Sequence, residues 1–182
     1  MSQAVASAAA LTPEAVWAAL DGLCDPEIPV VTLQEMGILR AVHLHPDRVE
    51  VVITPTYSGC PAMEQIHDDI LSALRGLGVQ AQVTTQLAPA WTTDWMTPVA
   101  REKLRAYGIA PPAPCASPTP AIQGQSGIVM QFARPLRARA VVPCPRCHSD
   151  NTTETSHFGS TACKALYKCL ACMEPFDHFK PY

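Results

Sequence analysis

The sequence has few charged residues and no long apolar run. Charged residues make up 16% of the 182 residues and the net charge is -3, so the chain lacks the overall basic character of many nucleic-acid-binding proteins. It contains no stretch of about 18 apolar residues, the length typical of a membrane-spanning helix. Residues 1–10 carry no positive charge, unlike the start of a secretory signal. We therefore expect a cytoplasmic protein.

Composition divides the chain into unequal parts. Residues 1–133 contain six Lys/Arg against twelve Asp/Glu, whereas residues 134–182 contain seven against four. Near the end of the first stretch, the segment 108–127 holds five prolines among small and polar residues, a composition typical of a semi-rigid spacer without a core. We predict an α+β domain at 11–107, a Pro-rich linker at 108–127 and a metal-ribbon domain at 128–182.

Hydrophobic periodicity predicts an α-β-β-α-β-α order for the first domain. Helix-capping residues, alternating apolar residues and turn residues mark the ends of its elements. The result is a small sheet with helices on one face. The predicted elements are a helix from Thr12 to about Gly22, strands at 38–44 and 48–54, a helix from Ser58–Pro61 to Gly76, a strand at 79–87, and a helix from Thr97 to about Gly108.

Two Cys-x-x-Cys pairs dominate the C-terminal part. This spacing indicates a metal site rather than disulfides, because each pair forms a tight loop that aims two thiolates at one ion. Four sulfurs close the coordination shell, so the metal is expected to be structural. Zinc is preferred, and iron or an iron–sulfur cluster is the alternative. The four predicted ligands are Cys144, Cys147, Cys169 and Cys172.

The rest of the ribbon is predicted to be β-rich. Strands are expected within 152–157, 162–168 and 175–180. His148 and Met173 occupy positions after the second cysteine of each pair, where ribbons often have glycine in a left-handed conformation. Cys163 lies about 20 Å along a strand from Cys169, so we expect it to be a small packed side chain rather than a fifth ligand.

Basic residues of the C-terminal part suggest a second possibility, binding to nucleic acid or to an acidic protein surface. Such a sparse cluster is usually just a solvated face, and the lack of interleaved aromatic residues counts against nucleic acid. These residues are Arg134, Arg137, Arg139, Arg146, Lys164 and Lys168.

Cys60 is the candidate functional thiol of the first domain. It precedes Pro61 at a predicted helix start, where backbone N–H groups and the helix dipole stabilise a thiolate. A solvent-facing nucleophile or transient metal ligand is one interpretation, and a small N-cap is the other. Asp25 and Glu27 lie in a proline-stiffened loop that could fold toward Cys60, or they could serve only their own turn.

Two stretches resemble the iron–sulfur-assembly domain family that includes SufT. These are residues 25–30 together with 35–37, and residues 54–61, which end in Ser58-Gly59-Cys60-Pro61. The similarity covers roughly 11–107. With the segments 158–169 and 174–180, the whole chain resembles the PaaD family, also called PaaJ.

The PaaD resemblance implies an accessory subunit or iron–sulfur maturation factor of the multicomponent phenylacetyl-CoA 1,2-epoxidase in aerobic phenylacetate degradation, not catalytic alone. It favours Cys60 as the functional thiol, transiently holding iron or a cluster, with Asp25, Glu27, Thr54 and Thr56 as neighbours.

Expected partners are other epoxidase components, especially the iron–sulfur flavoprotein reductase, and no membrane. Three alternatives remain open. The chain could be a stable non-catalytic structural subunit of that complex, a nucleic-acid-binding ribbon protein, or a thiol enzyme with a base beside Cys60.

Overall fold

The computed structural model describes residues 11–113 and 141–182. The first of these segments contains three α-helices, a short 3-10 helix and two small sheets, and it also contributes a strand to the sheet of the second. Its elements are α1 (Pro13–Leu20), β1 (Cys24–Asp25), β2 (Ile28–Thr32), β3 (Leu39–Leu44), β4 (Val49–Ile53), α2 (Met63–Arg75), β5 (Ala81–Thr85), η2 (Thr93–Trp95), α3 (Pro98–Tyr107) and β6 (Ile109–Ala110). None of the helices in the described part of the chain is long and apolar enough to cross a membrane.

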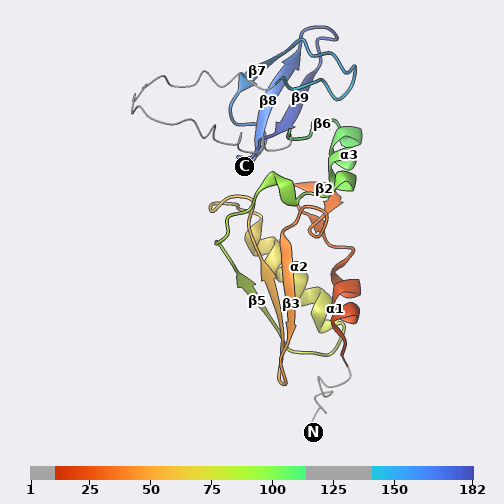
Figure 1. Cartoon of the computed structure of the whole chain (residues 1–182), viewed down its shortest axis with the longest axis vertical. Helices are drawn as coiled ribbons and strands as arrows, with labels where there is room; N and C mark the ends of the chain where they lie inside the picture. The colour runs from red at the N-terminus through yellow and green to blue at the C-terminus, as the bar shows by residue number, and fades with distance from the viewer. Residues whose placement is uncertain (1–10, 114–140) are drawn as a thin grey trace, which may run out of the picture.

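The larger sheet has the strand order β3-β4-β5. Strands β3 and β4 form the expected antiparallel hairpin, while β5 returns through α2 and pairs with β4 in parallel. Helix α2 turns Ile66, Ile70 and Leu74 into the core, each with at most 1% of its surface exposed, and α1 lies beside α2 (Figure 1). The predicted α+β class is confirmed.

A short hairpin, β1–β2, precedes the larger sheet where the sequence predicted only an ordered loop. The carboxylate of Asp25 closes its turn, because Oδ1 accepts hydrogen bonds from the backbone N–H of Glu27 at 2.7 Å and of Ile28 at 3.1 Å. After β2, Thr32 and Glu35 cap one another reciprocally at 3.0 and 3.1 Å. This reciprocal pair is a capping box.

The C-terminal sheet has the order β6-β9-β8-β7. Strands β7 (Thr152–Ser156), β8 (Lys164–Cys169) and β9 (Pro175–Phe179) form the three antiparallel strands expected from the sequence. Strand β6 follows α3 directly and pairs with β9 in parallel. The predicted linker 108–127 therefore begins with an ordered strand, and its remainder from residue 114 lies outside the described residues.

The C-terminal sheet packs against the first part of the chain. Phe179 and Cys163 belong to the same buried apolar cluster as the core residues of the α+β part. The ring centroid of Trp91 lies 6.0 Å from that of Phe179 and 6.3 Å from that of Tyr182, and the backbone N–H of Thr93 donates to the Tyr182 carbonyl at 3.2 Å. The C-terminus consequently lies at the junction of the two parts (Figure 1).

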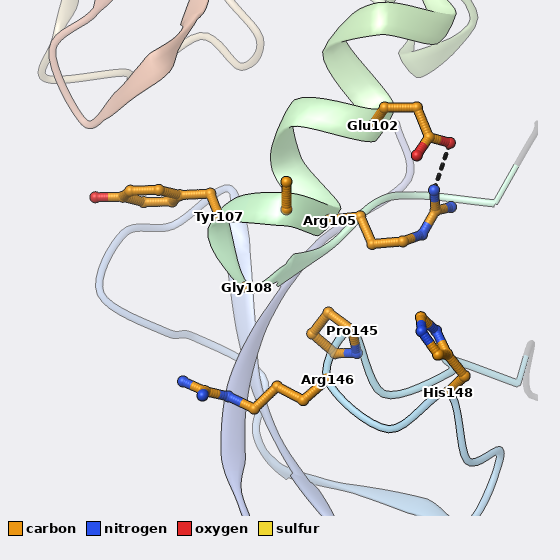
Figure 2. A pocket seen from close by; sticks show the side chains of 8 residues that line it. Glu102, Arg105, Tyr107, Gly108, Pro145, Arg146 and His148 are labelled. Atoms are coloured by element: carbon orange, nitrogen blue, oxygen red, sulfur yellow. Dashed lines mark hydrogen bonds and ion pairs between the residues drawn. The ribbon is translucent and has the colours of Figure 1, made fainter.

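An open hollow of about 580 Å³ lies at another place along the same boundary. It separates the last turn of α3 from the first Cys-x-x-Cys loop (Figure 2). Arg105, Arg146 and His148 line it, and Arg105 forms an ion pair with Glu102. The two parts are thus in contact through β6 and through the rings of Trp91, Phe179 and Tyr182. The hollow beside α3 is open to solvent.

The pairing of β6 with β9 also buries a histidine. The ring nitrogen Nδ1 of His178 lies 3.2 Å from the Ala110 carbonyl oxygen, to which it can only donate. Burial lowers the pKa of His178 to about 4, against an ordinary value of 6.5. The protonated form is therefore disfavoured in the folded protein.

We predict that His178 contributes to acid destabilisation. Its folded pKa lies below its unfolded pKa, so the stability that it contributes is present above about pH 6.5 and is lost as the pH falls toward 4, by about 2 kcal/mol at pH 5. His178→Gln keeps a donor to Ala110 but removes this titration. Denaturant unfolding at neutral pH and at pH 5 should show a smaller pH-dependent loss in the variant. Wild type and variant both keep the four cysteines of the predicted metal site, so any effect of pH on that site is common to the two proteins. An equal pH-dependent loss of stability in both would contradict the assignment to His178.

Candidate functional site: a four-cysteine cluster and a thiol at the domain junction

The four predicted ribbon ligands converge on one point. Their sulfur atoms all lie within 4.8 Å of one another. The Sγ atoms of Cys144 and Cys172 are 3.8 Å apart, and those of Cys147 and Cys169 are 3.5 Å apart. A tetrahedron with zinc–sulfur bonds of about 2.3 Å has sulfur–sulfur edges of roughly 3.8 Å. The cluster therefore has the size of a closed four-thiolate metal site.

The two loops that carry these cysteines share one backbone feature. His148 and Met173, each following the second cysteine of a pair, have φ angles of 60° and 66°. This is the left-handed conformation that favours glycine. The left-handed backbone that ribbons often have at these two positions is therefore present here, although neither residue is glycine.

Hydrogen bonds within the loops favour the thiolate form of at least one cysteine. The N–H groups of Cys172 and Ala171 lower the pKa of Cys169 to about 6, and the first of these lies 3.4 Å from the sulfur. A hydrogen bond from the N–H of Glu174 acts in the same direction on Cys172, but burial and the neighbouring sulfurs raise the pKa of that thiol to about 12. Without a metal ion, the thiols of the cluster therefore differ in how readily they release their protons. A bound metal would displace the protons that remain on the sulfurs.

Cys60 lies just before helix α2 rather than in its first turn. The helix begins at Met63, whose N–H approaches the Cys60 carbonyl at 3.4 Å. The side chain is half-buried, so the expectation of a fully solvent-facing thiol needs correction. Burial raises the pKa of Cys60, and a hydrogen bond from the Ala62 N–H offsets this only in part. The predicted thiolate stabilisation is outweighed, and Cys60 is a protonated thiol at neutral pH.

The carboxylates of Asp25 and Glu27 belong to the electrostatic environment of Cys60. The charges of both carboxylates raise the pKa of the Cys60 thiol. Burial raises the pKa of Asp25 itself, although two backbone N–H groups and the charge of Lys164 lower it in part. These acidic groups therefore share one partly desolvated region, and their roles toward Cys60 remain a prediction.

Thr54 and Thr56 lie in the segment that leads to Cys60. Both are buried, with 2% and 7% of their surface exposed. They line a cavity of about 270 Å³ together with Tyr57 and Tyr182, and Cys60 is not among the residues that line it. Their role as neighbours of the functional thiol stays a prediction.

Sequence reasoning missed the position of Cys163. It is a small packed side chain, as predicted, with 5% of its surface exposed. Its contacts, however, belong to the core of the α+β part, and its charge acts on Cys60. The sequence shows only that Cys163 lies outside both Cys-x-x-Cys pairs. Its burial in the core of the α+β part depends on how the two parts pack together.

The remaining candidates for site chemistry are dispersed. His45 pairs with Glu50 at 3.2 Å and His67 with Asp68 at 3.7 Å. In residues 11–113 and 141–182, none of the groups that shift the pKa of Cys60 is a histidine, so a thiol enzyme with a histidine base gains no support. Lys164 is buried, and Arg134, Arg137 and Arg139 lie outside the described residues.

Comparisons with known proteins agree with the two-part organisation. The family model described as the PaaD zinc beta ribbon domain matches residues 131–180, and the model of the iron–sulfur cluster assembly protein matches residues 13–85. The chain is 48% identical over 166 residues to an Escherichia coli (strain K12) protein that is named as one of the subunits of 1,2-phenylacetyl-CoA epoxidase. That alignment covers 91% of this chain and 90% of that protein.

Solved structures with similarity cover about half of the chain. One is a domain of unknown function from Bacillus anthracis, at 25% identity, 50% of this chain, 90% of that chain and a TM-score of 0.47. Another is a conserved hypothetical protein from Thermotoga maritima, at 29% identity, 52% of this chain, 94% of that chain and a TM-score of 0.45.

We predict that Cys147→Ser destabilises the ribbon through loss of metal. One of four sulfurs is removed, so the variant should lose more than about half of its zinc during dialysis against a chelator, because metal affinity is part of the folding free energy of such a domain. Cys24→Ser is the matched control, since Cys24 lies outside the cluster. Metal analysis and thermal unfolding measure the effect, and full zinc retention by C147S would disprove the ligand assignment.

The left-handed loop residues give a second prediction. His148→Gly and Met173→Gly should each raise the free energy of unfolding of the zinc-loaded protein by roughly 0.5–1 kcal/mol, because glycine adopts positive φ without strain. Ala171→Gly, in the same loop as Met173 but not at positive φ, should lower it by a similar amount. Denaturant titration checks this, and destabilisation by all three changes would show that the His148 and Met173 side chains matter more than their backbone.

Proposed function

This chain belongs to the PaaD family, and we propose that it acts as a maturation factor of the multicomponent phenylacetyl-CoA 1,2-epoxidase without being catalytic alone. The support for an accessory role is the 48% identity to the E. coli epoxidase protein across nearly the whole of both chains. The support for maturation is the iron–sulfur cluster assembly model over residues 13–85, the segment that contains Cys60.

Cys60 is the proposed transient holder of iron or of an iron–sulfur cluster. The single observation that carries this proposal is its environment within the matched segment: a half-buried thiol whose pKa is raised by burial and by the charges of Glu27 and Asp25. Thiolate sulfur binds iron well, and carboxylate oxygen is a second donor that suits Fe²⁺. A protonated thiol in the free protein is compatible with cargo that arrives and leaves, since the ion displaces the proton on binding.

The ribbon is proposed to hold structural zinc and to dock onto an epoxidase component. Its closed set of four sulfurs leaves no coordination position for chemistry. Several large apolar side chains remain exposed on this part of the chain, and a partner that covered them would bury apolar surface. They are Val141, Phe158, Leu166, Leu170 and Met173, with 36–63% of their surface exposed. The iron–sulfur flavoprotein reductase of the complex is the proposed partner.

A stable structural subunit is the second candidate, favoured by the word "subunit" in the name of the E. coli relative. The two functions differ in stoichiometry. A structural component co-purifies with the oxygenase in equal amount and resists washing with salt, whereas a maturation factor is recovered in smaller amount or lost. Affinity purification of the tagged oxygenase from cells that express all components separates the two.

The maturation proposal predicts that Cys60→Ser weakens iron capture. Zinc-loaded wild type, C60S and the control C24S would be incubated anaerobically with Fe²⁺, with and without sulfide, and desalted. We expect iron and visible absorption in the wild type and in C24S, and a loss of at least about tenfold in iron affinity in C60S, because one sulfur ligand is removed. Zinc content should be equal in all three. Equal iron retention by C60S would refute Cys60 as the holder.

A further inference from the structure

Another hollow, of about 300 Å³, lies over one face of the C-terminal sheet. Ala165 of β8 pairs in register with His178 of β9, and Tyr167 of β8 pairs with Glu154 of β7. Because paired residues and residues two apart on a strand share a face, the small side chain of Ala165 lies among larger ones and leaves space above it. This space is referred to as the Ala165 hollow. Its lining is completed by His157, Lys180, Pro181 and Tyr182.

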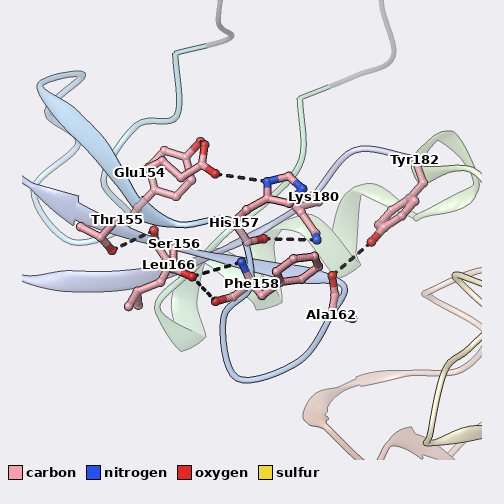
Figure 3. Close-up of polar contacts among 10 residues, drawn as sticks. Glu154, Thr155, Ser156, His157, Phe158, Ala162, Leu166, Lys180 and Tyr182 are labelled. Atoms are coloured by element: carbon pink, nitrogen blue, oxygen red, sulfur yellow. Dashed lines mark hydrogen bonds and ion pairs between the residues drawn. The ribbon is translucent and has the colours of Figure 1, made fainter.

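Hydrogen bonds hold the rim of the Ala165 hollow in place (Figure 3). The ring nitrogen Nδ1 of His157 lies 3.2 Å from the Glu154 carboxylate, and the Lys180 ammonium donates to the His157 carbonyl at 3.3 Å. On another side, the Tyr182 hydroxyl donates to the Ala162 carbonyl at 3.3 Å. Side chains that are already held in this way lose little further freedom when a ligand binds. The hollow therefore has a preformed shape.

The imidazole of His178 brings an unused hydrogen-bond acceptor to the Ala165 hollow. Its Nδ1 donates to the Ala110 carbonyl at 3.2 Å, and a pKa of about 4 keeps the ring neutral at pH 7, so Nε2 carries a lone pair and no proton. Nε2 has no hydrogen-bond partner within the described residues, although only 7% of the His178 surface is exposed. Among those residues, no side-chain nitrogen or oxygen atom is both fully buried and unpartnered, so Nε2 is reachable from a cavity. A donor group on a ligand would complete its hydrogen bonding.

Aromatic side chains form much of the wall. The Tyr167 ring meets the His178 ring edge-on, with centroids 5.3 Å apart and an interplanar angle of 88°, and Tyr182 also lines the hollow. An apolar cavity of about 150 Å³ binds benzene, so the larger Ala165 hollow has room for one aromatic ring with a substituent. Glu154 and Lys180 carry opposite charges, so the lining favours a neutral ligand over an ion.

We propose that the Ala165 hollow is a binding site for a small neutral aromatic molecule that carries a hydroxyl group, of which phenol is the simplest. The hydroxyl donates to Nε2 of His178, and the ring packs against Tyr167 and Tyr182 above Ala165. This site lies apart from Cys60 and from the four-cysteine cluster, so it goes beyond the proposed function and does not depend on it.

Chemical-shift titration of the ¹⁵N-labelled, zinc-loaded full-length protein tests the site with phenol, anisole and benzoate. Phenol should shift the amide signals of Ala165, Tyr167 and His178. Anisole keeps the ring and the oxygen but has no proton to donate, so it should bind about fivefold more weakly, the equivalent of one hydrogen bond. Benzoate is an ion without a donor at neutral pH and should bind no better than anisole.

Two substitutions separate the acceptor from the space. His178→Phe keeps an aromatic ring but has no nitrogen, so the preference for phenol over anisole should disappear. Ala165→Leu fills the hollow and should weaken the binding of both molecules by about tenfold or more, because a packed interior leaves no room for a ring. Thr153→Val is the control and should match the wild type, since Thr153 precedes Glu154 on β7 but does not line the hollow.

Each outcome bears on the proposal. Equal affinity of the wild type for phenol and anisole, or an unchanged preference in His178→Phe, would overturn the hydrogen bond to Nε2. Wild-type binding by Ala165→Leu, or phenol-induced shifts only at residues away from the hollow, would overturn the site, as would a failure of the wild type to bind phenol. Circular dichroism and zinc content verify the fold of each variant. Ala165→Val, which adds less volume, replaces the leucine variant if leucine disturbs the sheet.

Discussion

The small C-terminal sheet cannot be stabilised by an apolar core of its own, and this constraint shapes the rest of the molecule. Among the residues that the structure describes, its separate buried cluster contains five, two of which are cysteines of the four-cysteine cluster. Units of this size need a metal or packing supplied by a neighbour. Here both are present: four sulfurs converge at one end of the sheet, and at the other end Phe179 and Cys163 enter the core of the α+β part. The second of these devices buries Cys163, a cysteine of the ribbon, in the core of the α+β part.

Much of the fold could be predicted from the sequence because its signals are local. Capping residues such as Thr32 and Thr97 make the hydrogen bonds that their positions indicate, and alternating apolar residues predict β3, β4, β8 and β9 to within a few residues. Strands β1, β2 and β6 were missed, and two of them, β1 and β6, have only two residues each. Such short strands have no periodicity, and β6 exists only because β9, nearly 70 residues later in the chain, lies beside it.

The candidate sites differ in how well the sequence reveals them. A Cys-x-x-Cys pair forms a loop of characteristic geometry, so the ribbon cluster can be predicted from the spacing of its cysteines. The left-handed backbone of His148 and Met173 belongs to the same loop geometry. The surroundings of Cys60 depend instead on tertiary packing. Burial, which the sequence does not show, raises the pKa of this thiol against the effect of the nearby N–H group. The placement of Cys163 depends on docking, which local patterns do not encode.

The parallel pairing of β6 with β9 has a consequence for the covalent chain. One strand of the C-terminal sheet precedes residues 114–140 and the other three follow them. A single cleavage between residues 114 and 140 would therefore leave two polypeptides joined by a shared sheet and by the Trp91–Phe179 contact. Conversely, a fragment that starts at residue 128 would expose the edge of β9, which then becomes available for pairing with another strand. The ribbon and the α+β part are separate in composition but interdependent in structure.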